Sequence, residues 1–236
     1  MVANRDEFHR RPTLPAHFWT EYPGMLAGKD LEAGGSWLGI TRNGRFAALT
    51  NYRQIPAPYN GEISRGELVS GYLQSPLDAA DYLQGVAAQA MRYDGFNLIV
   101  GDLNQCWYFS NRAPAGPEPL QPGIYGLSNH LLNTPWPKVR LARENLDRSL
   151  QAQPRLEDLQ HCLSSTTLAP DHELPDTGIG LSWERMLSAP RIISPQYGTR
   201  ANTRLILQRA QFEFQEDTYN PAGEVTGSER FIVNIS

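Results

Sequence analysis

Residues 37–50 read WLGITRNGRFAALT, and this stretch decides the fold class. Asn43-Gly44 lies between two apolar runs, and both central positions of a type I′ turn must accept positive φ. The stretch therefore predicts a β-hairpin closed by a type I′ turn. Residues 96–100 and 106–110 predict a second hairpin, around the polar residues 102–105.

Strands and helices follow in blocks on both sides of these hairpins. Further strands are predicted at residues 124–127, 203–208, 212–217 and 230–235, and helices at residues 64–73, after Ser75-Pro76, and at 137–150. Ser64 and Glu67 have the spacing of a capping box at the start of the first helix. No strand–helix–strand unit repeats, so we expect an α+β fold of stacked antiparallel sheets covered by helices. A chain of 236 residues suits a single domain over residues 1–236.

Composition excludes several classes of protein. Acidic residues outnumber basic ones, 25 to 21, and the arginines are dispersed, so we expect no nucleic-acid binding. No apolar run approaches the roughly 18 residues of a membrane span. Cys106 and Cys162 have neither CxxC nor metal-ligand spacing, which predicts no metal site. With charged residues where a signal peptide would be apolar, we expect a cytoplasmic protein.

The first polar cluster is Asn4-Arg5-Asp6-Glu7. Arg5 can clamp an anionic ligand with its planar fork while Asp6 orients a bound group. Alternatively, Arg5 and Asp6 form an ion pair at a strand end. The glycine-rich residues 27–39 leave a similar choice between a tight turn and a close backbone approach to a ligand.

Other polar and aromatic residues fall at predicted strand ends. Asn51 and Tyr52 end the first hairpin, Asn129 and His130 follow another strand, and Arg200 precedes the last sheet. Rigid sheets present such residues to clefts. We therefore expect one cleft to contain side chains that are far apart in the sequence, namely Asn4, Arg5, Asp6, Asn51, Asn129 and Arg200.

Six motifs resemble, in the same order, the NRDE-motif family, also called the transport and Golgi organisation family. They are Asn4-Arg5-Asp6-Glu7, residues 34–39 (GGSWLG), residues 50–53 (TNYR), residues 64–66 (SRG), residues 126–129 (GLSN) with 134–139 (TPWPKV), and residues 197–200 (YGTR). This resemblance covers residues 3 to about 206. It implies the αββα sandwich of the N-terminal-nucleophile hydrolases.

Family members usually begin Met-Cys and an apolar strand, whereas here the NRDE motif starts at residue 4. We therefore expect the family's first strand and its cysteine to be missing. Because that mechanism needs Cys, Ser or Thr at the N-terminus, we expect no amidase activity from the chain as given. A missing strand exposes a sheet edge, so we expect another segment to cover the edge, or aggregation or a homodimer through it.

The resemblance implies two functions. The first is ligand handling, most directly haem binding and trafficking, with haem as cargo and no cofactor required. Arg5 and Arg200 would meet the propionates, and His130 is the candidate axial donor. The ring would stack on Trp37, Tyr52 or Trp136. The alternative is an amidohydrolase acting on linear C–N amide bonds of an amide or lipid-like metabolite, with Arg5, Asp6, Asn51, Asn129 and Arg200 around the reaction centre. A structural or adaptor role is a third, less specific reading.

Overall fold

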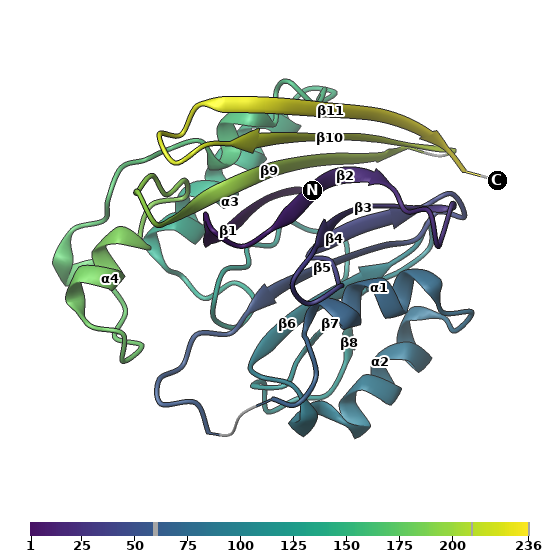
Figure 1. Cartoon of the computed structure of the whole chain (residues 1–236), viewed down its shortest axis with the longest axis horizontal. Helices are drawn as coiled ribbons and strands as arrows, with labels where there is room; N and C mark the ends of the chain where they lie inside the picture. Colours follow the sequence, from purple (N-terminus) through teal and green to yellow (C-terminus); the bar gives the residue numbers. More distant parts are fainter. Residues whose placement is uncertain (59–60, 209, 236) are drawn as a thin grey trace.

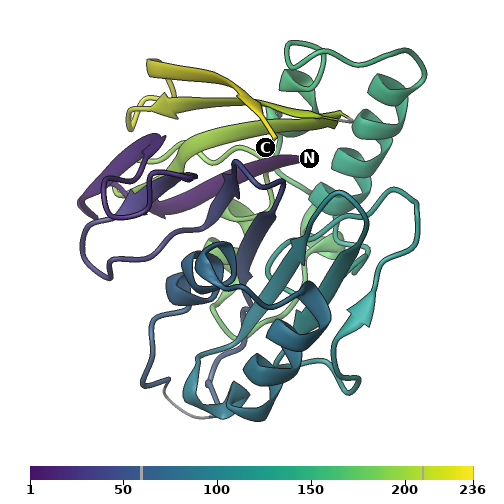
Figure 2. The same ribbon diagram turned by 90° about the vertical axis from the view of Figure 1, so that its right-hand side faces the viewer.

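Two antiparallel sheets lie face to face in the computed structural model, which describes residues 1–58, 61–208 and 210–235 (Figure 1). The elements, in chain order, are β1 (Val2–Phe8), β2 (Thr13–Phe18), β3 (Met25–Asp30), β4 (Leu38–Thr41), β5 (Phe46–Asn51), α1 (Gly66–Gln74), α2 (Ala79–Ala88), η1 (Ala90–Arg92), β6 (Phe96–Gly101), β7 (Cys106–Ser110), β8 (Glu118–Pro119), α3 (Pro137–Leu150), η2 (Gln160–Leu163), η3 (Asp171–Glu173), α4 (Leu181–Met186), β9 (Tyr197–Gln208), β10 (Gln211–Tyr219) and β11 (Val225–Asn234). Helices α1 and α2 cover one sheet, and α3 stands beside the other (Figure 2). The expected α+β sandwich of antiparallel sheets with helices outside is confirmed.

The seven-stranded sheet is a chain of consecutive neighbours, in the order β2 to β8. It contains both predicted hairpins, β4–β5 and β6–β7. The predicted type I′ turn is wrong, because only Gly44, at φ 86°, has positive φ and Asn43 does not. The Thr41 hydroxyl accepts from Arg45 N at 3.1 Å and contacts the Asn43 side chain, so a longer loop with one left-handed residue replaces the tight turn.

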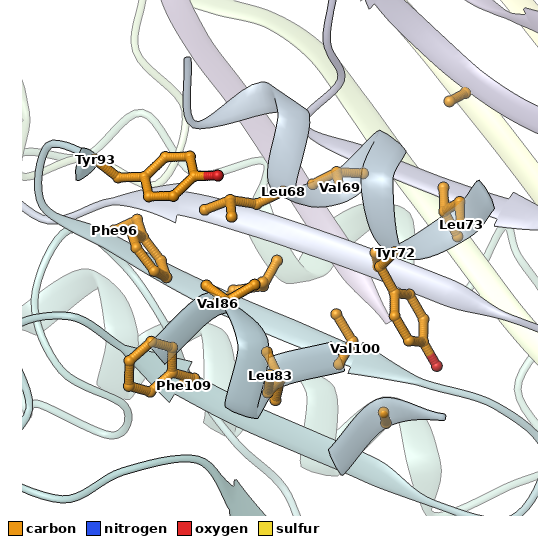
Figure 3. Packing of buried hydrophobic residues seen from close by; sticks show 14 of the residues in the cluster. Leu68, Val69, Tyr72, Leu73, Leu83, Val86, Tyr93, Phe96, Val100 and Phe109 are labelled. Carbon is orange, nitrogen blue, oxygen red and sulfur yellow. The ribbon is translucent and has the colours of Figure 1, made fainter. Parts of the chain in front are cut away.

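One apolar core lies between this sheet and its helices (Figure 3). Leu68 and Tyr72 of α1 and Leu83 of α2 are fully buried, because they recur at the helical spacing that turns one face toward the strands. Phe96 and Val100 meet them from strand β6. Neither helix uses the predicted cap: α1 has no side-chain cap, and Asp78 rather than Ser75 caps α2 by accepting from Asp81 N at 2.9 Å.

The four-stranded sheet, in the order β1-β9-β10-β11, joins the two ends of the chain. A second apolar core fills the space between the sheets, with Leu26 and Ile40 facing Phe212 and Phe214. A carboxylate oxygen of Glu216 also accepts from the main-chain nitrogen of Ala16 at 2.7 Å, which ties β10 to β2. Residues 124–127 form no strand, contrary to the sequence prediction, and instead run along the cavity described below.

The outer edge of β1 has no strand beside it in the described chain. Met1 and Leu205 exchange both main-chain hydrogen bonds, at 2.7 and 2.9 Å. Because bonded pairs alternate along an antiparallel ladder, the main-chain groups of Val2 and Asn4 point away from β9. Asn4 reaches over to the carbonyls of Leu163 and Pro190, so other segments cover part of this edge. The homodimer through the edge stays a prediction.

Gly35 lets α1 approach the glycine-rich loop, which explains that loop as a packing device. A Cβ at Gly35 would lie 2.4 Å from the main-chain carbon of Gly66, and Ser36 N donates to Gly66 O at 3.2 Å. Gly35→Ala is therefore expected to displace α1 and lower the free energy of unfolding by about 1–3 kcal/mol, as measured by urea denaturation. Gly85→Ala is the matched control, since nothing lies within 4 Å of its Cβ and alanine favours the helix. Equal stability of the two variants would contradict this account.

Candidate functional site

A cavity of about 1060 Å³ lies along β1. Residues 1–7 form one wall, residues 48–51 of β5 and residues 123–129 form others, and α3 closes the side. Small-molecule sites span roughly 300–1,000 Å³, so this cavity has room for a large ligand.

One face of α3 supplies much of the apolar wall. Pro137 occupies the first turn of the helix, where its missing N–H is not needed. The cavity-lining positions then follow at intervals of three and four, which places them on one helix face: Lys138, Val139, Ala142, Arg143, Leu146 and Leu150. This face combines aliphatic side chains with two cations.

The nine residues selected from the sequence divide into two groups. Six line the cavity: Asn4, Arg5, Asp6, Trp37, Asn51 and Asn129. Tyr52, His130 and Arg200 do not. Six residues distant in the sequence were expected to share one cleft. Five of them line this cavity, and Arg200 does not.

Arg5 is buried, with 8% of its surface exposed, and is held from two sides. Its Nη2 donates to Asp30 Oδ2 at 3.1 Å, and its guanidinium lies 4.4 Å from the ring centroid of Trp37. The ion pair with Asp6 considered from the sequence is therefore replaced by one with Asp30. Burial lowers the pKa of Arg5, and nearby Arg200 acts in the same direction. Its Nη1 is buried without a partner among the described residues.

Asp6 and Asn4 point to the opposite face of β1 from Arg5. The Thr199 hydroxyl donates to Asp6 Oδ1 at 2.6 Å, across a bulge between Arg5 and Asp6 in the β1–β9 register. Burial raises the pKa of Asp6, opposed by the charge of Lys138 and the bond from Thr199. Asn4 uses both ends of its amide inside the protein, since its Oδ1 also accepts from Asn202 at 2.7 Å. Asp6, not Asn4, is therefore the polar group of this face that remains available to a ligand.

Asn51 and Asn129 form the polar end of the cavity. The Asn129 side chain donates to the main-chain oxygen of Asn51 at 3.1 Å, and Arg53 N donates to Asn129 O at 2.7 Å. These bonds fasten the segment after Gly126 to the end of β5. The Asn51 side chain is exposed and lines the cavity, so it can meet a ligand.

His130 and Tyr52 form a structural pair outside the cavity. The Tyr52 hydroxyl lies 2.8 Å from His130 Nε2, and His130 Nδ1 lies 2.9 Å from the Thr134 hydroxyl. That hydroxyl already donates to Leu131 O, so Nδ1 must donate and Nε2 must accept. Burial lowers the pKa of His130, with Arg53 adding to the effect, which favours this neutral form. The axial role expected of His130 in the cavity does not fit, because both ring nitrogens are engaged elsewhere.

Arg200 also has a structural partner set. Its Nη1 contacts the carbonyl of Arg11 and lies 3.3 Å from the Thr13 hydroxyl, so it fastens the β1–β2 loop. Arg200 is not among the residues that line the cavity, and its role beside a haem propionate stays a prediction. Arg200 acts on the site only through its charge beside Arg5.

Several cavity residues were not selected from the sequence. Asp30 pairs with Arg5 and Arg11, at 3.1 and 2.6 Å, and Lys138 and Arg143 project from α3. The spacing Val139, Ala142, Leu146 was a usable signal for a lining helix face. In the described chain no group of three or more His, Cys, Asp or Glu side chains is placed to hold a metal ion.

Fold and site together define an α+β sandwich protein with a large cavity, lined by both aliphatic and polar residues, at the edge of one sheet. The family model of Transport and Golgi organisation 2 matches residues 1–221. The chain is 40% identical over 226 residues to the Transport and Golgi organization protein 2 homolog of Homo sapiens, covering 88% of this chain and 81% of that one. It is 28% identical over 255 residues to Transport and Golgi organization protein 2 of Drosophila melanogaster, covering 95% and 88%. The chain belongs to the Transport and Golgi organisation 2 family.

Among solved structures, a variant of conjugated bile acid hydrolase from Clostridium perfringens is similar at a TM-score of 0.38 and 9% identity, covering 98% of this chain and 90% of that one. None of the helices in the described ranges has the length and apolar character needed to cross a bilayer.

Proposed function

We propose that this protein binds a largely apolar small molecule bearing an acidic group in the cavity along β1, and hands it on without covalent change. Haem is the first ligand to test, and a lipid-like carboxylic acid is the second. The cytosolic location expected from the sequence is part of this proposal.

The observation that carries the proposal is a large cavity whose wall combines aliphatic side chains, several of them from α3, with the cations Arg5, Lys138 and Arg143. Nη1 of Arg5 is buried without a partner among the described residues, and a buried donor without an acceptor costs about 1–3 kcal/mol, so this wall of the cavity has unused hydrogen-bonding capacity. Opposite charges on the lining are already matched in part, because Asp30 is paired with Arg5 and Arg11. Lys138 and Arg143 on α3 have no ion pair with a described residue, so they favour an anion.

No histidine of the described chain lines the cavity, so we expect haem to be held by ring contacts and charge rather than by histidine ligation. Weak attachment suits a carrier, which must release its cargo. His130→Ala should leave the Soret band and the affinity unchanged, since its nitrogens bond Tyr52 and Thr134.

Arg5→Ala is expected to weaken ligand binding by about tenfold or more, because it removes a charge-assisted contact worth roughly 1.5–3 kcal/mol. Haem titration followed by absorbance, and a parallel titration with a fluorescent fatty acid, measure the effect and distinguish the two ligand sources. Arg230→Ala is the control, since Arg230 is a half-exposed arginine that pairs with Glu157 at 2.7 Å away from the cavity. Ala142→Trp, which narrows the cavity, should weaken binding without removing any charge.

No saturable binding of either probe at micromolar concentration would overturn this proposal. If the parent, Arg5→Ala and Ala142→Trp proteins bound the probes with equal affinity, the cavity would not be the binding site.

The amidohydrolase alternative is favoured only by the polar end of the cavity, where Asn51 and Asn129 could surround an amide. Burial raises the pKa of Cys106, a thiol on the cavity wall, to about 11. A thiol with that pKa stays protonated at neutral pH and is a poor nucleophile. We therefore place ligand binding first; burst release from a chromogenic amide, in step with protein concentration, would reverse that order.

A further inference from the structure

Lys138 is a cavity-lining amine that no described residue contacts by a hydrogen bond or a direct ion pair. It is the second residue of α3, is partly exposed, and lies on the helix face that lines the cavity. Its ammonium makes no hydrogen bond or direct ion pair with any residue that the structure describes. The chain has only one other lysine, Lys29, which pairs with Glu21 at 2.7 Å and lies 4.5 Å from the Trp19 ring centroid.

The surroundings of Lys138 make its ammonium easier to deprotonate than that of an ordinary lysine. Burial lowers the pKa of Lys138 to about 8. The groups that face it are Asp6 of β1 and Glu184 of α4, which oppose this, and Arg53 after β5, which adds to it. The positive end of the α3 dipole also disfavours an ammonium in the first turn.

Among the acidic groups, Asp6 raises the pKa of Lys138 most, but its effect is smaller than the lowering caused by burial. Its Oδ1 accepts from the Thr199 hydroxyl at 2.6 Å, and burial raises its pKa. A fully ionised carboxylate in direct contact would hold the lysine as an ammonium. Because Asp6 has a raised pKa and makes no direct ion pair with Lys138, it does not hold the amine as an ammonium, and it lies close enough to exchange a proton with it.

We propose that Lys138 is a nucleophile that captures an aldehyde or ketone in the cavity as an imine. The nitrogen lone pair forms a bond to the carbonyl carbon, and the carbonyl π electrons move to oxygen. Both amine hydrogens then leave with that oxygen as water, and hydrolysis reverses the step. Asp6 is the neighbouring group able to carry the proton from nitrogen to oxygen. Neutral amines in desolvated pockets are suited to this chemistry.

The inference deepens the proposed function by naming a carbonyl as a ligand group of the same cavity, and it can fail separately. Hexanal is used as the probe, with sodium borohydride to reduce any imine to a stable secondary amine. Peptide mass spectrometry then reads modification at Lys138 and Lys29 in the same molecule, and separates both from the terminal amine.

At pH 7 we expect Lys138 to be trapped on the order of a hundredfold faster than an ordinary exposed lysine, because a larger fraction is neutral. The rate at Lys138 should level off above about pH 8, because the amine is then mostly neutral. Ala142→Trp should slow trapping at Lys138 and leave Lys29 unchanged. Lys138→Met should abolish trapping of hexanal at position 138 and leave the thermal unfolding curve unchanged.

Trapping at Lys138 no faster than at Lys29, or unaffected by Ala142→Trp, would overturn the proposal. Fast trapping combined with no binding of haem or fatty acid would support Lys138 as a nucleophile and contradict the binding of an acidic ligand. Saturable haem binding without fast trapping would support the binding of an acidic ligand and contradict the role of Lys138.

Discussion

Asp217→Ala is expected to lower the free energy of unfolding by about 3–5 kcal/mol. Arg204 and Asp217 are 2% and 5% exposed, and Arg204 Nη2 lies 2.6 Å from Asp217 Oδ2. Two other guanidinium nitrogens of Arg204, Nε and Nη1, have no partner among the described residues. Removing the carboxylate leaves a charge in the protein interior with nothing to balance it.

Urea unfolding, followed by tryptophan fluorescence, measures this effect. Asp158→Ala is the matched control, because Asp158 forms a surface pair with Arg155 and should change stability little. The double variant Arg204→Met, Asp217→Leu removes both charges and should be more stable than Asp217→Ala alone. A single variant as stable as the control, or a double variant less stable than the single, would show that this pair is not a buried charge pair.

Phe214→Ala is expected to cost about 3–5 kcal/mol by opening a void between the sheets. Phe214 is fully buried, belongs to the core between the two sheets, and packs edge-on against Phe231 at 6.2 Å. Its loss removes contacts on both sheets at once.

Ile232→Ala in β11 is the control for this variant, since Ile232 is 63% exposed in the same sheet. It should unfold close to the parent protein. Because domains are typically stable by only 5–15 kcal/mol, a loss of the expected size should shift the urea midpoint clearly. A Phe214→Ala protein with the midpoint of Ile232→Ala would contradict the packing of the two sheets.

Local sequence signals predicted most of the elements. Asn43-Gly44 between apolar runs indicated the β4–β5 hairpin, and Pro137 with its following periodicity indicated α3. Details that depend on single side chains were missed: the Thr41 hydroxyl changed the turn, and Asp78 rather than Ser75 caps α2. Such choices are decided by hydrogen bonds worth about 1 kcal/mol, which residue patterns do not resolve.

Only one part of the site could be predicted from the sequence, namely that polar residues at strand ends share a cavity. Arg5, Asp6, Asn51 and Asn129 do line one cavity. His130 was misplaced because its partner Tyr52 lies 78 residues earlier in the chain, and no local pattern shows that contact. Lys138 was missed for the same reason: its role depends on β1, which reaches it only through the tertiary fold.

The pairing of β1 with β9 has a consequence for how the protein is made. Strands β2 to β8 pair with their neighbours in sequence and lie within residues 13–119, so they can pair while the chain is still emerging from the ribosome. β1 pairs with residues 197–204, and this long-range contact must wait for nearly the whole chain. The cavity wall formed by β1 is therefore completed last, and a nascent chain halted before β9 would hold the helix-covered sheet but have no place for a ligand.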